Sequence, residues 1–495
     1  MNFGIIRYVI ARILRLEVIF ILFPLGVSFI YGEPFALKRA YGVTILLLFG
    51  AAFLLSRKAP ENMKLHSKES FVIVSLTWIL MSLFACLPFY LSRHIPSFVD
   101  ALFEVVSGFT TTGATILTNV EALPKSLLFL RGFTHFVGGM GVLVLAMAIL
   151  YKNNDESLYL MKAEVPGPTF GKLVAKMSYN SRILYIIYIT MTLILIVLLY
   201  AGGMPLFDAV VHAFGTAGTG GFSVKNGNIG AYGSAYLEYV IAVAMLMFGL
   251  NFNLFYALLL KNFRQVYKNE EMHWYLKIAL CATILICFDI YPRYGSNLAK
   301  CIRDTFFTVS SIMTTTGYAV VDFDTWPVFS KAVLFALMFV GGCAGSTAGG
   351  LKVSRIMILV KYIKSMVRRE VDPNRVTTVR VDGKPLEKEL FHRVTGYLAL
   401  MVFLFMLFIL FIAKDTPDFQ SAFGAVANTI NNVGLGFGKV GPSLNNAFFS
   451  AHNKLILILC MLFGRLEIFP MLILFSPSFY KDMFFKVKIK GMDEY

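Results

Sequence analysis

Two stretches of this chain repeat one polar motif inside apolar surroundings. The first, "GFTTTGAT", covers Gly108 to Thr115, and the second, "IMTTTGYA", covers Ile312 to Ala319. Threonine hydroxyls and the backbone of a glycine need hydrogen-bond partners or water when apolar residues flank them. The recurrence of this motif therefore indicates a repeated structural element that places polar groups at depth.

The pair belongs to a set of four segments with equal spacing. The segments read "DALFEVVSGFTTTGAT", "DAVVHAFGTAGTGGFS", "DTFFTVSSIMTTTGYA" and "SAFGAVANTINNVGLG". In each segment a glycine lies thirteen positions after the first residue: Asp100 to Gly113, Asp208 to Gly221, Asp304 to Gly317, and Ser421 to Gly434. Internal repeats of this kind organise a fold. We predict a unit of helix, re-entrant segment and helix that occurs four times.

The composition is that of a membrane protein. Of 495 residues 57% are hydrophobic, only 15% are charged, and the mean hydropathy is +0.70. The formal net charge of +16 is compatible with nucleic-acid binding, but the Lys and Arg residues fall in short loops, as the positive-inside rule requires. We therefore expect contact with membrane lipid and no nucleic-acid partner. The six cysteines and seven histidines show no metal-ligand spacing.

Ten apolar segments are long enough to cross a bilayer, which takes roughly 20 residues. They lie at about 15–32, 38–56, 70–93, 127–151, 182–202, 236–260, 273–292, 331–360, 391–413 and 452–475. We divide the chain into two N-terminal helices (1–69) and four repeats: 70–152, 153–262, 263–389 with a broken second helix, and 390–495 with a cytoplasmic tail. The basic loops fall on one face, which predicts that both termini are cytoplasmic.

The repeated segment suits a cation filter. We interpret Asp100, Asp208, Asp304 and Ser421 as helix N-caps rather than ion ligands. A short helix then descends, and its C-terminal end carries partial negative charge. The returning strand can replace the hydration shell of an ion with carbonyl oxygens, and glycine permits the positive φ angles that such a turn requires.

We refer to the four polar quartets as re-entrant segments 1 to 4, and all sixteen residues are candidate ion ligands. They are Thr110, Thr111, Thr112 and Gly113; Gly218, Thr219, Gly220 and Gly221; Thr314, Thr315, Thr316 and Gly317; and Asn431, Asn432, Val433 and Gly434. Glycine and threonine also serve merely to let membrane helices pack closely. Four segments with one spacing favour the filter over that alternative.

Two further features are candidates for a gate. The eighth span is interrupted by "GGCAGSTAGG", in which five of ten positions are glycine: Gly341, Gly342, Gly345, Gly349 and Gly350. So much glycine predicts an unwound loop, although a kink or close packing is the alternative. Arg465 lies within the tenth predicted span, where a charge is costly and faces a partner or water. It either tunes cation passage or forms a structural salt bridge.

These motifs together resemble the Trk/Ktr/HKT superfamily of potassium transporters, and within it the TrkH-type bacterial potassium uptake subunits, which have two additional N-terminal helices. The resemblance rests on the four segments, on "GGCAGSTAGGLKVSR" from Gly341 and on "FGRLEIFPMLILFSP" from Phe463. It implies an all-α integral membrane fold with four pseudo-symmetric membrane–pore–membrane repeats around one pore. Segment 4 departs from the pattern, with Asn431, Asn432 and Val433 in place of threonines.

The same resemblance implies the functional details. The filter glycines would be those that end the four segments, and the gate would comprise Gly341–Gly350, Lys352 and Arg465. Potassium would be the transported substrate, with no organic cofactor. The protein would be a homodimer in the bacterial inner membrane, with a cytosolic nucleotide-binding regulatory subunit docked on its basic face.

Rival functions fit the sequence less well. A secondary transporter of an organic solute would be expected to show inverted repeats and two discontinuous helices, whereas these repeats run parallel. A non-conducting scaffold or sensor would not need four intact glycines. An enzyme is not expected, because no nucleophile triad, carboxylate pair or metal cluster stands out. Whether transport is channel-like or coupled to protons or sodium stays open.

Overall fold

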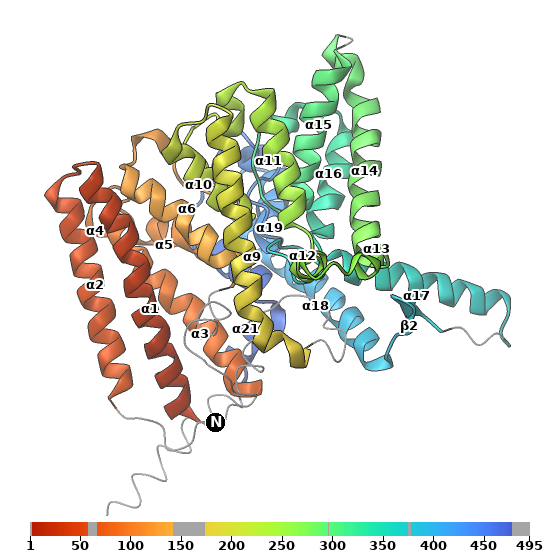
Figure 1. The fold of residues 1–495 in the computed structure, drawn as a ribbon, viewed down its shortest axis with the longest axis horizontal. Helices are drawn as coiled ribbons and strands as arrows, with labels where there is room; N and C mark the ends of the chain where they lie inside the picture. The colour runs from red at the N-terminus through yellow and green to blue at the C-terminus, as the bar shows by residue number, and fades with distance from the viewer. Residues whose placement is uncertain (1, 58–66, 142–173, 296, 375–377, 478–495) are drawn as a thin grey trace, which may run out of the picture.

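The computed structural model describes residues 2–57, 67–141, 174–295, 297–374 and 378–477. Helices α1 (Phe3–Ile30) and α2 (Phe35–Ser56) lie together along one side of the molecule, against the helices that follow them (Figure 1). Helix α1 begins well before the predicted position 15, because the Asn2 side chain accepts a hydrogen bond from the Ile5 amide and caps it. The basic N-terminal arm is thus helical.

The remaining helices run from α3 to α21. In chain order they are α3 (Ser67–Ala85), α4 (Leu87–Leu91), α5 (Phe98–Phe109), α6 (Lys125–Gly139), α9 (Val174–Ala201), α10 (Leu206–Ala217), α11 (Ala235–Phe248), α12 (Phe252–Leu259), α13 (Phe263–Tyr267), α14 (Glu270–Ile290), α15 (Leu298–Met313), α16 (Val328–Val340), α17 (Val353–Val371), α18 (Lys388–Ala413), α19 (Phe419–Ile430), α20 (Ala451–Arg465) and α21 (Ile468–Leu474). Strands β1 (Arg380–Val381) and β2 (Lys384–Pro385) form a small antiparallel hairpin after α17.

Within the described part of the chain, six helices are long and apolar enough to span a membrane, or seven if one bent pair counts as a span. Where they are described, the predicted spans coincide with helices. Apart from a one-residue break at Cys86 in the third span, two are broken where we expected continuity. The sixth bends by 92° between α11 and α12, and the tenth stops between α20 and α21, where Glu467 adopts φ 58°. The part of predicted span 127–151 beyond residue 141 lies outside the described residues. The basic stretch 58–66 and the tail 478–495 also lie outside them.

The four short helices that precede the re-entrant segments are α5, α10, α15 and α19. Our assignment of their N-caps was wrong, because each helix begins earlier. Ser97, Pro205, Asn297 and Asp418 hold the N-cap positions. The four residues that we expected there lie inside the helices and bind other partners.

Those partners hold the N-terminal ends of the four short helices. Asp100 pairs with Lys454 at 2.6 Å. Asp208 accepts a hydrogen bond from Tyr232, and Asp304 accepts one from Tyr294. Ser421 donates its amide to Asp418. An acidic group in the first turn still benefits from the positive helix end, so Asp100 and Asp208 favour their helices without capping them.

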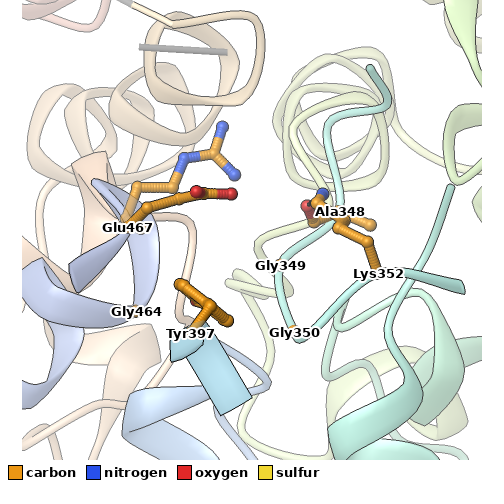
Figure 2. A pocket seen from close by; sticks show the side chains of 8 residues that line it. Ala348, Gly349, Gly350, Lys352, Tyr397, Gly464 and Glu467 are labelled. Atoms are coloured by element: carbon orange, nitrogen blue, oxygen red, sulfur yellow. Dashed lines mark hydrogen bonds between the residues drawn. The ribbon is translucent and has the colours of Figure 1, made fainter. Parts of the chain in front are cut away.

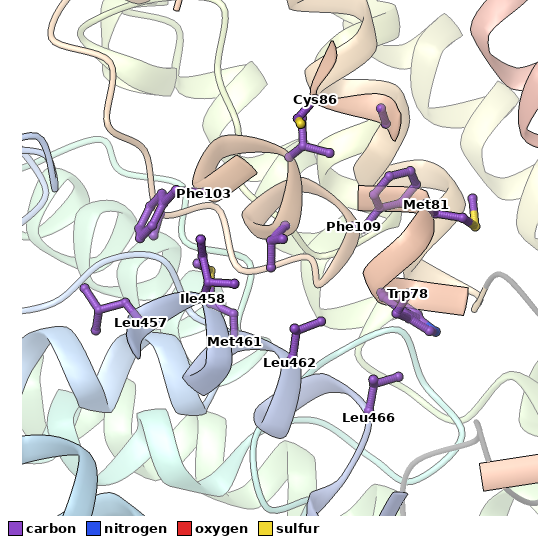
Figure 3. Packing of buried hydrophobic residues seen from close by; sticks show 14 of the residues in the cluster. Trp78, Met81, Cys86, Phe103, Phe109, Leu457, Ile458, Met461, Leu462 and Leu466 are labelled. Atoms are coloured by element: carbon purple, nitrogen blue, oxygen red, sulfur yellow. The ribbon is translucent and has the colours of Figure 1, made fainter. Parts of the chain in front are cut away.

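The helix that follows each short helix packs against the next short helix, in a closed cycle. The contacting pairs are α6 with α10, α11 with α15, α16 with α19, and α20 with α5. Figure 3 shows the last of these contacts, in which Phe103 of α5 lies near Leu457 and Ile458 of α20. Helix α20 thereby packs against α5 and closes the cycle.

We expect the cap of α19 to make stability pH-dependent. Hydrogen bonds from the amide and hydroxyl of Ser421 lower the pKa of Asp418, so its contribution is full above the usual Asp pKa and is lost as the pH falls through the lowered value. Asp418→Ala should cost about 1 kcal/mol near neutral pH, measured as thermal unfolding of the detergent-solubilised protein. This difference should fade in acid. Asp418→Asn keeps a capping oxygen without the charge, and a large loss of stability in that variant at neutral pH would contradict the capping role.

Candidate functional site

The four short helices end in the same backbone turn. After the C-cap of α5 at Thr110, Thr111 adopts a left-handed conformation with φ 53°. The Thr111 amide donates to Gly108 O, and the Thr112 amide donates to Ser107 O, which is the pairing of a Schellman motif. Thr219, Thr315 and Asn432 occupy the equivalent position with φ of 53°, 56° and 54°. A left-handed residue that is not glycine costs about 1–2 kcal/mol, so the turn is held in place by its surroundings.

The glycine that ends each segment touches the backbone of the next segment. Gly113, Gly221, Gly317 and Gly434 have φ between 76° and 85°. A Cβ atom on each would lie 2.0 to 2.3 Å from a neighbouring carbonyl oxygen: Gly113 against Gly220, Gly221 against Thr316, Gly317 against Val433, and Gly434 against Thr112. The contacts join segment 1 to segment 2, segment 2 to segment 3, segment 3 to segment 4, and segment 4 to segment 1. The four turns therefore form a closed ring in which no side chain fits between neighbours.

The side chains of the segments form hydrogen bonds mainly within the protein. Thr110 Oγ1 donates to Val106 O at 2.7 Å and shares a hydrogen bond with Thr112 Oγ1, and Thr314 repeats both contacts with Ser310 and Thr316. In segment 4, Asn432 Nδ2 donates to Thr112 Oγ1 at 2.9 Å. The asparagine thus links segment 4 to segment 1, and its backbone keeps the conformation of the other segments.

The glycine-rich interruption of the eighth span is an unwound loop between α16 and α17, and it lies against the re-entrant segments. Gly341, Gly345 and Gly350 have φ of 69° to 73°, and Lys352 has φ 77°. The Gly349 amide donates to Thr315 Oγ1 at 2.6 Å. A Cβ on Gly349 would lie 2.6 Å from Asn431 O, so this part of the loop packs closely against segments 3 and 4.

Arg465 is the last residue of α20, at the break, and it binds this loop. Its Nη1 donates to Thr347 O at 2.7 Å, and its Nη2 donates to Gly138 O and Gly139 O, both at 2.6 Å. Arg465 therefore connects the loop to the C-terminal end of α6, where helix carbonyls carry partial negative charge. These three partners are backbone carbonyls.

A narrow cavity separates the loop from the break in the tenth span. Ala348, Gly349 and Lys352 line one side, and Gly464, Glu467 and Tyr397 line the other (Figure 2). Glu467 forms an ion pair with Arg355 of α17 at 2.7 Å, and Lys352 donates to Ala348 O. Basic groups thus concentrate around the loop.

Sequence reasoning missed two buried carboxylates. Glu271 of α14 accepts hydrogen bonds from the Ala344 and Ser354 amides at 2.7 and 3.1 Å, so one oxygen joins the two ends of the loop. Glu104 of α5 pairs with Arg131 of α6 at 2.7 Å. A charge inside an apolar stretch was the available signal. Among the described residues no group of three or more His, Cys, Asp or Glu is arranged to hold a metal ion.

Comparisons with known proteins identify the family of this chain. A family model described as a cation transport protein, TrkH, matches residues 38–487. The Trk system potassium uptake protein TrkH of Escherichia coli K12 is 34% identical over 96% of this chain and 99% of its own length. The TrkH of Salmonella typhimurium is 36% identical over 85% of this chain and 88% of its own length.

A solved structure resembles the whole molecule. The crystal structure of the potassium transporter TrkH from Vibrio parahaemolyticus superposes with a TM-score of 0.87 at 31% sequence identity. The superposition covers 97% of this chain and 100% of the Vibrio chain. The family model begins within α2 and extends beyond α21. The chain is an all-α, multi-pass membrane protein that belongs to the TrkH family of cation transport proteins.

Proposed function

We propose that this protein takes up potassium ions across the bacterial inner membrane through the ring formed by re-entrant segments 1 to 4. The observation that carries the proposal is the closed series of glycine–carbonyl contacts between neighbouring segments. The names of the relatives, which are potassium uptake proteins over nearly their full length, support potassium as the ion. An enzyme activity is excluded by the family, whose members transport cations.

In this mechanism the backbone carbonyl oxygens coordinate the ion. A dehydrating potassium ion exchanges water oxygens for carbonyl oxygens of the four segments. The C-terminal ends of α5, α10, α15 and α19 add partial negative charge. The threonine hydroxyls hold the turns, as the Thr110–Thr112 and Thr314–Thr316 contacts illustrate. Selection depends on how rigidly the ring keeps its dimensions.

The loop from Gly341 to Lys352 serves as the gate below the ring. Its contact with Thr315 and its three-way connection through Arg465 to Thr347, Gly138 and Gly139 support this role. In the closed state the positive charge of Arg465 stands beside the pathway and opposes cation passage. Opening requires these hydrogen bonds to break.

The wider assembly follows from the same proposal. The repeats span 70–152, 153–262, 263–389 and 390–495, and both termini face the cytoplasm. Helix α17 carries Lys361, Lys364, Arg368 and Arg369 away from the membrane-spanning part, and this basic face suits a cytosolic nucleotide-binding regulatory subunit. Two copies of the chain form the functional dimer.

The alternative is a secondary transporter of an organic solute, and the broken helices are the observation that favours it. The four segments repeat in parallel along the chain, whereas such a transporter is expected to show inverted repeats, which argues against it. Uptake of ⁴²K⁺ or ⁸⁶Rb⁺ into vesicles that contain the purified protein separates the two, with imposed potassium, sodium or proton gradients and with organic solutes as competitors. If potassium does not permeate the wild type, the proposal fails.

We expect Gly113→Ala to abolish most potassium uptake. The added Cβ would lie 2.0 Å from Gly220 O, and overpacking of this kind costs about 1–3 kcal/mol, so uptake in reconstituted vesicles should fall about tenfold or more. Gly203→Ala is the matched control, because Gly203 has a similar φ of 87° but nothing within 4 Å of a Cβ. Equal losses in the two variants would show that backbone strain, and not the ring contact, was responsible.

Arg465→Ala should raise potassium uptake. The variant removes both the contacts to Thr347, Gly138 and Gly139 and the positive charge beside the pathway, so we expect the rate in vesicles to rise about tenfold, equivalent to about 1.4 kcal/mol. Arg393→Ala removes an exposed arginine that pairs only one helical turn away with Glu389 and serves as the control. An unchanged rate in the Arg465 variant would remove this residue from the gate.

A further inference from the structure

A buried ion pair lies behind the first two re-entrant segments. The side chains of Glu104 and Arg131 are 0% and 3% exposed, and Arg131 Nε lies 2.7 Å from Glu104 Oε1. Burial of two charges costs several kcal/mol per ion unless further hydrogen bonds compensate. The destinations of those further bonds therefore indicate what the pair holds in place.

Glu104 binds the strand that leaves segment 1. Its Oε1 accepts a hydrogen bond from Thr115 Oγ1 at 2.9 Å, and its Oε2 accepts one from the Ile116 amide at 3.0 Å. Thr115 is the second residue after Gly113. The carboxylate thus fixes the strand immediately beyond the turn.

Arg131 binds the corresponding strand of segment 2. Its Nη1 donates to Ser223 O at 3.1 Å, and Ser223 is the second residue after Gly221. The guanidinium also lies 3.8 Å from the centroid of the Phe222 ring, a cation–π contact. Because Glu104 and Arg131 bind each other, the two strands are joined at the same level of the ring.

The other junctions of the ring are built differently. His212, the equivalent of Glu104 in the second repeat, shares a hydrogen bond with Ser223 Oγ at 3.0 Å. Tyr318 donates its hydroxyl to Phe222 O, between segments 3 and 2. The Asn446 amide donates to Thr115 O, next to segment 1. Thr308 and Ala425 occupy the equivalent position in the third and fourth repeats, so the ionic brace belongs to the first junction.

We propose that Glu104 and Arg131 are positioning residues for ion selectivity: by joining the strands behind segments 1 and 2 they fix the width of the ring at that junction. The proposal rests on the proposed filter function. Discrimination between potassium and the smaller sodium ion depends on the size of the site and on the number and placement of its carbonyls. A loosened junction lets the carbonyls approach a smaller ion, so the pair keeps sodium out without touching either ion.

The first test separates the arginine fork from its charge. Arg131→Lys keeps a positive partner for Glu104 but loses the planar fork that reaches Ser223 O. We expect potassium uptake to persist while the ratio of potassium to sodium uptake falls about tenfold, equivalent to about 1.4 kcal/mol. The change should appear mainly as a lower KM for sodium, measured in vesicles loaded with equal amounts of folded protein.

A second variant guards against a failure of Arg131→Lys to fold. Thr115→Val keeps the ion pair and nearly the same volume but removes the hydroxyl that contacts Glu104. It should lower the same ratio in the same direction. Glu238→Gln is the matched control, because it breaks the Glu238–Arg303 pair, also 2.7 Å long, between α11 and α15; its ratio should equal that of the wild type.

The outcomes are distinguishable from a failure of the filter itself. A wild type that does not pass potassium would overturn the proposed function, whereas this inference is overturned if wild type and both variants pass potassium with one unchanged ratio. It is also overturned if Glu238→Gln lowers the ratio as much as Thr115→Val, since a general loss of stability would then account for the effect.

Discussion

The contact of a glycine with a carbonyl oxygen of the next segment is the constraint on which the rest of the molecule depends. Because glycine has no Cβ, four backbone turns approach one another more closely than any other residue allows, and Gly434 returns the series to Thr112 of segment 1. A ring of this kind closes only when the four short helices are held at matching depth and angle. The helix packing, from α5 against α6 to α20 against α5, supplies that condition.

The ring contains left-handed backbone conformations that the same segments would avoid in an unfolded chain. Thr111, Thr219 and Thr315 are left-handed residues with φ near 55°, each unfavourable by about 1–2 kcal/mol. Strain of this size persists where the surroundings determine the backbone, and it concentrates at functional sites. Here the surroundings are the Schellman hydrogen bonds, the threonine hydroxyl contacts and the buried apolar faces of the short helices, such as Phe103 against α20 (Figure 3).

The glycine-rich loop between α16 and α17 is also held by contacts from the rest of the protein. An unwound loop at membrane depth leaves amides and carbonyls that water cannot satisfy, so they must find partners in the protein. Glu271 takes the Ala344 and Ser354 amides, Thr315 takes the Gly349 amide, and Arg465 takes the Thr347 carbonyl. Each partner comes from a different helix or segment, so several parts of the molecule hold the loop in place.

The sequence by itself determined the membrane setting, the fourfold spacing and the interrupted eighth span. Hydropathy, the thirteen-residue interval that ends in glycine, and glycine content are all local properties of the sequence. It placed the helix starts at Asp100 and Asp304 wrongly, since Ser97 and Asn297 compete for the cap and only three-dimensional contacts choose between them. The bend at Gly249–Asn251 was equally hidden, because its amides and carbonyls pair with the distant loop, as Cys343 N does with Gly249 O. Tertiary structure alone decided which carbonyl each segment glycine meets and that Arg465 binds the carbonyls of α6, because those partners lie far away in the sequence.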